Sequence, residues 1–196
     1  MRTLECRLAI DDLDGFVAAL GDIGDRTGTT VQAFDARYVA DRRHLKRALE
    51  LADRSIARGE NVARDRAVEI LLYAAGRRQI DRALEMGIGE RETRAVVLVD
   101  RRPDGGDCSR ADTDDGNGIG GTDVSDAESE AVDAESEAVD AIRDLEAFVG
   151  EEPTLDSPDE TTLCAFFDVT DAEREATDAS LGALVRERVA LLEVEK

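Results

Sequence analysis

The chain has 196 residues, and 42% of them are hydrophobic, which is enough to bury one sizeable core. Acids outnumber bases 46 to 25, only two of the bases are lysines, and the formal net charge is −21. This balance, together with few aromatic residues, is typical of a protein that stays hydrated in concentrated salt. At about 1 M salt the Debye length is roughly 3 Å, so long-range steering is lost and recognition depends on contact.

Cysteine spacing and the length of the apolar runs bear on the cellular compartment. The three cysteines have no mutual spacing suited to a metal cluster or a redox motif, and their odd number argues against a disulfide framework. The longest apolar runs, 70–76 and 95–99, are far shorter than the about 20 residues that a membrane span needs. Acids near the start interrupt any signal-peptide hydrophobic region. We therefore expect a cytoplasmic protein with no membrane partner.

The first 60 residues predict two strands and two helices. Alternating apolar residues favour one strand at 4–10 and another at 29–34. Between them, an aspartate can cap a helix that ends at Gly21. A longer amphipathic helix is expected at 41–59, with apolar side chains on one face and several arginines on the others.

The next segment predicts a buried helix with a glycine stop. Asn61 offers an N-cap, and residues 67–75 are almost all apolar, so the helix should be buried on nearly every side. Gly76 is placed to end it. A short helix at 78–86 follows and ends at Gly87, with three side chains expected to point inward: Ile80, Ala83 and Leu84.

Residues 103–141 differ sharply in composition from the rest of the chain. They contain 13 acids, one base and six of the 16 glycines. The first part, 103–121, reads as a disordered loop. The second part contains the same seven residues twice, at 127–133 and 134–140, and predicts one long helix with a weak alanine seam. We favour a lengthened, solvated helix over a coiled-coil dimer, with core attachment through three residues: Ile142, Leu145 and Phe148.

Beyond Pro153 the pattern is mainly helical. Two capping boxes, 157–160 and 170–173, each start a helix. An apolar run at 184–194, helical or partly extended, closes the sequence.

The elements taken together predict an α+β fold. A fully apolar, β-branched strand at 95–99 joins the two earlier strands in a small mixed or antiparallel sheet flanked by several helices. We expect a single domain made of residues 1–102 and 142–196. In this scheme 103–141 is an acidic, low-complexity insertion.

Several motifs that would indicate an enzyme or a metal site are poorly supported. Residues 116–121 fit the dinucleotide pattern G-x-G-x-x-G, but no strand leads into them and the surrounding acids would repel a pyrophosphate. A calcium loop starting at Asp112 lacks suitable ligands at its later positions. His44 is the only histidine, so catalytic triads and multi-histidine metal sites lack support. We interpret His44 as a helix-face residue, and we expect no cofactor and no metal.

Basic residues gather in one region of this acidic chain. Residues 37–82 hold 12 bases and seven acids, a balance of +5. Beside Tyr73 and Ile80, five arginines offer a place for phosphates and unstacked bases: Arg64, Arg66, Arg77, Arg78 and Arg82. Charge alone supports equally a structural alternative, in which the arginines form local ion pairs with Asp65, Glu69, Asp81 and Glu85.

The turn Gly76-Arg77-Arg78-Gln79-Ile80, inside the longer stretch 61–88, is the most specific motif in the chain. Two further segments, 165–173 and 185–192, accompany it. Together they resemble the small regulatory subunit of the KEOPS complex, which in eukaryotes is called the PRPK-binding protein (TPRKB) family. With the acid excess, the resemblance suggests an archaeal, haloarchaeal version. Asp168 departs from the glycine that the family pattern has at that position.

This resemblance implies a subunit that is not an enzyme. It would bind the kinase-like ATPase subunit of KEOPS and the unpaired 3′ CCA end of tRNA. A separate transferase subunit would then place a threonylcarbamoyl group on the adenosine beside the anticodon. Matching residues imply tRNA contacts from Arg64, Arg78 and Ile80, with Tyr73, Arg77 and Gln79 as lesser candidates. An arginine fork suits phosphate, Ile80 or Tyr73 offers a face for a base, and Gln79 can read a base edge.

Two alternative functions stay open from the sequence. The chain could be a protein-interaction module that regulates a partner kinase or ATPase without binding RNA. It could also be an enzyme that uses Glu69 with Tyr73. Against the enzyme, Glu69 lies in the apolar helix and reads as a buried carboxylate paired with Arg78 or Tyr73.

Overall fold

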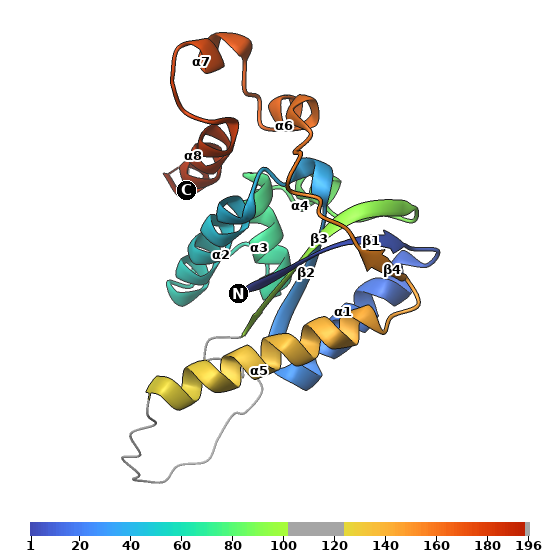
Figure 1. Ribbon diagram of the computed structural model, residues 1–196. Coiled ribbons are helices and arrows are strands. Elements are labelled where there is room, and N and C mark those ends of the chain that lie inside the picture. The colour runs from blue at the N-terminus through green and yellow to red at the C-terminus, as the bar shows by residue number, and fades with distance from the viewer. Residues whose placement is uncertain (102–123, 195–196) are drawn as a thin grey trace, which may run out of the picture.

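An antiparallel sheet with the strand order β2-β3-β1-β4 organises the molecule (Figure 1). The computed structural model describes residues 1–101 and 124–194. Within them, β3 pairs with β1 along the whole of β1, and β2 pairs with the other edge of β3. β4 pairs only with residues 6–8 of β1. The strands are β1 (Arg2–Ala9), β2 (Thr29–Asp35), β3 (Glu92–Arg101) and β4 (Phe148–Glu151).

Helices cover both faces of this sheet (Figure 1). Strand alternation in β3 explains why two cores form: Val96 and Leu98 face one side, whereas Ala95, Val97 and Val99 face the other. The first side carries α2 (Arg42–Ala57), α3 (Arg66–Ala75), α6 (Glu160–Phe166) and α8 (Leu181–Val194). The second side carries α1 (Leu13–Thr27) and α5 (Val124–Arg143). The predicted α+β class is therefore confirmed.

Short elements connect the longer ones. They are the 3-10 turns η1 (Ala36–Tyr38) and η2 (Leu84–Met86) and the helices α4 (Ile80–Ala83) and α7 (Asp171–Glu175). None of the helices in the described ranges has both the length and the apolar character needed to cross a bilayer. The glycine-rich stretch 103–121, including the G-x-G-x-x-G motif and most of the calcium-like loop, lies outside the described residues.

The predicted end of the first helix and the predicted start of the buried helix were wrong. Helix α1 continues through Gly21 and ends at Gly28, whose left-handed backbone (φ 65°) provides the cap. Burial of Ile23 against the sheet gives these extra turns a reason to persist. The N-cap of α3 is Asp65 and not Asn61, because the Asp65 carboxylate accepts hydrogen bonds from the first turn of the helix.

The long helix predicted from the duplication is present as α5, but it ends earlier than the predicted seam. Phe148 belongs to strand β4, where it pairs with Leu8 of β1. The second half of α5 packs on the sheet, since Ala138 and Val139 are buried in the same core as Ile142. Glu135 is also buried. Residues 135–141 therefore include side chains that pack on the sheet, although they lie within the predicted insertion 103–141.

Two further local predictions can be compared with the C-terminal helices. The Thr170 side chain accepts a hydrogen bond from the backbone N–H of Glu173, which confirms a helix start at the second capping box. At the first box, Ser157 is not the N-cap; the Asp159 carboxylate caps α6 by accepting from Thr162. The first predicted helix thus starts two residues later than its capping box.

Asp168 adopts a left-handed backbone conformation, with φ 54°. Asp168→Gly should stabilise the folded state by about 1–2 kcal/mol, because glycine relieves this strain. The greater chain entropy of glycine in the unfolded state should offset about 0.4–1 kcal/mol of that gain. We expect a net rise of roughly 0.5–1 kcal/mol in the free energy of unfolding, measured by urea denaturation at constant salt. Asp168→Ala is the matched control, because it removes the carboxylate but keeps the strain, and it should not stabilise. A Gly variant no more stable than the Ala variant would contradict this explanation.

Candidate functional site

The turn that follows α3 is shaped by Gly76. Its backbone lies in the left-handed region (φ 59°), its N–H donates to the carbonyl of Tyr73, and the N–H of Arg77 donates to that of Leu72. This pair of hydrogen bonds is a Schellman motif, which satisfies the last carbonyls of the helix and turns the chain sharply. Any side chain at this position would be strained. The predicted glycine stop is confirmed, and it directs the following residues away from the buried helix.

Arg77 points back into the protein. Its guanidinium donates to the backbone carbonyl of Phe166, lies 5.5 Å from the centroid of the Phe166 ring, and contacts the Asp168 carboxylate at 3.4 Å. These contacts join the turn to the last residue of α6 and to the segment after it, far away in the sequence. Arg77 therefore holds the turn in place and is already engaged within the molecule.

Arg66 is also a structural residue. It forms ion pairs with Asp53 of α2, at 2.7 Å, and with Asp100 of β3, at 2.6 Å. Burial by itself would lower the pKa of Arg66, but the hydrogen bonds to Asp53 and Asp100 outweigh this effect and raise the pKa. This charge ties the start of α3 to α2 and β3, and its partners differ from the local acids expected from the sequence.

Three of the five arginines have a different environment. Arg64, Arg78 and Arg82 are exposed, and none of them forms an ion pair with any residue in the described ranges. The local ion pairs that were the structural alternative are therefore not formed by these side chains. Their guanidinium groups are available for an external anion, which is uncommon in a chain with a net charge of −21.

Exposed apolar side chains accompany these arginines. Ile80 is 41% exposed and Leu84 is 57% exposed, which corrects the prediction that both point inward. Helix α4 has only four residues, of which Ala83 is buried, and η2 buries only Met86. The rest of the surface of these two short elements is therefore largely uncovered. The exposed Val62 lines a small hollow of about 10 Å³ together with Arg77 and Arg78, so the chain before α3 lies beside the turn.

Gln79 is exposed beside Arg78, in a position to form hydrogen bonds with a ligand. Tyr73, in contrast, is only 2% exposed and belongs to the core of α3. Its ring offers no open face for a base, because the apolar helix that carries it is buried on nearly every side. The structure thus brings Arg78, Gln79 and Ile80 together at one surface and separates Tyr73 and Arg77 from it.

Glu69 is a buried carboxylate, as predicted. Its Oε2 atom accepts hydrogen bonds from the backbone N–H groups of Val62, at 3.0 Å, and Ala63, at 2.8 Å. These contacts stabilise the loop before α3, so the carboxylate has a positioning role. The expected pairing with Arg78 is absent among the described contacts, and the carboxylate bonds to these two backbone N–H groups instead.

His44 lies in α2, as expected, but on the helix face that is buried in the core. One ring nitrogen, Nε2, donates to the carbonyl of Ala74 at 2.8 Å, and Nδ1 accepts from the N–H of Ala40 at 3.3 Å. Burial lowers the pKa of His44 to about 4. Within the described residues, no group of three or more His, Cys, Asp or Glu side chains could hold a metal ion.

The different environments of Arg77 and Arg78 lead to a stability prediction. Arg77→Ala should lower the free energy of unfolding by about 1–3 kcal/mol, because the Phe166 carbonyl loses a charged donor. Arg78→Ala, one residue further along, should change it by no more than about 0.5 kcal/mol, as at other exposed sites. Urea denaturation of the two variants under identical salt conditions measures the difference. Equal losses of stability would mean that the Arg77 contacts contribute nothing.

An α+β scaffold that presents exposed arginines and apolar side chains around one turn has the features of a binding protein. The family model for kinase binding protein CGI-121 matches residues 20–193. Because this match covers most of the chain, the protein belongs to the kinase binding protein CGI-121 family. A search of curated proteins found no match.

Proposed function

We propose that this protein is a cytoplasmic, non-catalytic subunit of the KEOPS tRNA-modifying complex, in a salt-adapted archaeal form. In this role it binds the kinase-like ATPase subunit and the 3′ CCA end of tRNA. It thereby supports threonylcarbamoylation of the adenosine beside the anticodon by a separate transferase subunit. Membership of a kinase-binding family supports the protein partner. The observation that carries the RNA partner is the exposed turn where Arg78, which has no ion pair among the described residues, adjoins Ile80. Arg64 is likewise exposed, in the segment before α3.

The chemistry of this turn suits a single-stranded RNA end. Guanidinium groups bind phosphate with two parallel hydrogen bonds, and Arg64 and Arg78 need not break an ion pair with any described residue to do so. The exposed face of Ile80 can contact a splayed base, and the Gln79 amide can donate to or accept from a base edge. Arg77 and Tyr73 support this surface from inside the fold, so we propose no direct tRNA contact for either.

The tRNA end can be tested separately from the rest of the tRNA. Filter binding in concentrated potassium chloride compares intact tRNA with the same tRNA lacking its CCA end. We expect the truncated tRNA to bind at least about tenfold more weakly, since each stacked base contributes about 1–3 kcal/mol. Equal affinity for the two tRNAs would rule out recognition of the CCA end.

A second candidate function is supported by the apolar part of the same surface. Val62, Ile80 and Leu84 are all exposed, and such side chains also suit a contact with protein. In this alternative the chain regulates a partner kinase or ATPase without binding RNA. Absence of tRNA binding, with retained pull-down of the kinase subunit, would favour it.

A further inference from the structure

Strand β1 has one edge that is only half covered. On one side it pairs with β3 from Arg2 to Ala9. On the other side, β4 pairs with residues 6–8, and the N–H of Glu152 adds one more bond to the carbonyl of Glu5. Pro153 follows, and the chain then turns away, with Thr154 bonding to the side chain of Glu5. Residues 2–4 of β1 therefore have no neighbouring strand on this edge within the described part of the chain.

The backbone groups that face this open edge can be identified by alternation. In an antiparallel strand, the N–H and C=O of every second residue point to the same side. The carbonyl of Glu5 bonds to Glu152, and the N–H of Ala9 bonds to Ala147, both on the β4 side. By the same alternation, the N–H and C=O of Thr3 point to the open edge. Thr3 thus presents one donor and one acceptor to an incoming strand.

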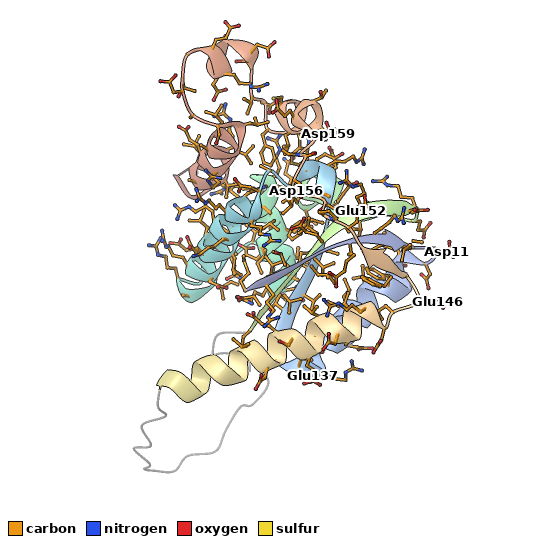
Figure 2. The ribbon with its side chains drawn as sticks, in the orientation of Figure 1. Asp11, Glu137, Glu146, Glu152, Asp156 and Asp159 are labelled. Carbon is orange, nitrogen blue, oxygen red and sulfur yellow. The ribbon has the colours of Figure 1, made fainter. Side chains whose placement is uncertain are left out.

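The open edge forms the floor of a cleft with a volume of about 700 Å³. Besides Met1 and residues 2–5 of β1, the cleft is lined by Arg42 of α2 and by Val139 and Arg143 of α5. The segment after β4 closes one end, and Figure 2 labels Glu152 and Asp156 on that segment. Helices α2 and α5 lie on opposite faces of the sheet and form the walls of this cleft. An extended chain could lie between them, beside β1 and in line with β4.

The charges around this cleft are largely paired with one another. Arg42 binds Glu5 at 2.6 Å, and Arg143 binds Glu151 at 2.6 Å. Glu152 is held by Arg94 at 3.0 Å. These pairs leave a nearly neutral lining on a protein whose net charge is −21, with apolar contacts from Leu4, Val139 and Pro153. A strongly charged ligand would have to compete with the existing ion pairs.

We propose that the edge at residues 2–4 of β1 binds an extended, uncharged segment of a partner protein by β-strand addition. The segment lies in the 700 Å³ cleft, exchanges main-chain hydrogen bonds with Thr3, and extends the line of β4. Its side chains alternate between Val139 on one side and Arg42 on the other. This contact is separate from the turn after α3 and does not depend on tRNA binding.

The test uses the full chain and defined peptides. Acetylated, amidated hexapeptides that alternate threonine with valine, leucine or isoleucine are titrated into the isotope-labelled protein and followed by NMR. We expect the Thr3 amide resonance to shift, with a Kd below about 1 mM for at least one peptide. The best peptide, N-methylated at the residues that face β1, should bind at least roughly tenfold more weakly because it lacks the donors.

A protein variant tests the same hydrogen bond from the other side. Thr3→Pro removes the N–H that faces the open edge, where proline is tolerated, and Thr3→Ala is the matched control that keeps it. We expect only Thr3→Pro to lose peptide binding while both variants stay folded. Three results would each overturn the proposal: no peptide binding at 1 mM, equal binding of the N-methylated peptide, or equal binding by both variants. The protein could also form a dimer without peptide, and Thr3→Pro could abolish that dimer. This result would assign the edge to a second copy of the chain and would also overturn the proposal.

Discussion

Replacing Arg78 with glutamate is expected to weaken tRNA binding by roughly 10- to 100-fold, which corresponds to about 1.4–2.8 kcal/mol. Arg78 is exposed at the turn after α3 and forms no ion pair within the described residues. The substitution therefore removes a phosphate-binding group and adds a repelling one without breaking an ion pair in the described part of the chain. Because about 1 M salt screens charges beyond roughly 3 Å, the loss should come from direct contact and should persist at high salt.

Arg26→Glu is the matched control for this experiment. Arg26 is exposed near the end of α1, on the other side of the sheet, so the charge change is the same at a site far from the turn. Filter binding with intact tRNA should show near wild-type affinity for Arg26→Glu. Both variants should retain kinase pull-down and the wild-type unfolding midpoint. Equal tRNA affinity for the two variants would remove Arg78 from the binding surface.

The second large effect concerns acid stability. Between about pH 6.5 and pH 4, the unfolded chain protonates His44 and the folded chain does not, because burial lowers the pKa of His44 to about 4. The unfolded state then binds more protons, so the free energy of unfolding falls as the pH falls. We expect a loss of roughly 3 kcal/mol across this window, at 1.36 kcal/mol per pKa unit.

The geometry explains why the folded protein resists protonation. Nδ1 of His44 accepts from the N–H of Ala40, so a proton there would face a donor. Asp41 favours the charged ring, Arg186 opposes it, and the desolvation of the buried ring exceeds both. The ordinary pKa values of Asp and Glu side chains, about 3.9 and 4.3, fall near the lower end of the same window, so the effect has to be isolated by comparison.

His44→Gln provides that comparison, because glutamine can hydrogen-bond but does not titrate. Urea unfolding of both proteins is measured at constant salt from pH 7 to pH 4. The wild type should lose up to roughly 1.4 kcal/mol more per pH unit than the variant in the middle of the window. Parallel pH profiles would show that His44 does not contribute to acid sensitivity, whatever the variant costs at pH 7.

Much of the candidate site could be predicted from local sequence. The apolar run of α3, the stop at Gly76 and the turn that follows are encoded by neighbouring residues, and the structure contains all three. These three features depend on side-chain chemistry within a few residues, so a single sequence is sufficient to read them. The glycine expected at position 168 came instead from the family resemblance, and the left-handed backbone of Asp168 agrees with it.

Only the tertiary structure shows which arginines form internal contacts and which are exposed. Arg66 and Arg77 look like Arg78 in the sequence, yet they bind Asp53 and Phe166 on other elements. The order of the strands, the packing of α5 on the sheet and the open edge of β1 likewise depend on which segments meet in space. The sequence by itself therefore determined the helix, the turn and the concentration of positive charge around it. Only the tertiary structure decided which of those charges stay exposed, because their competing partners come from distant parts of the chain.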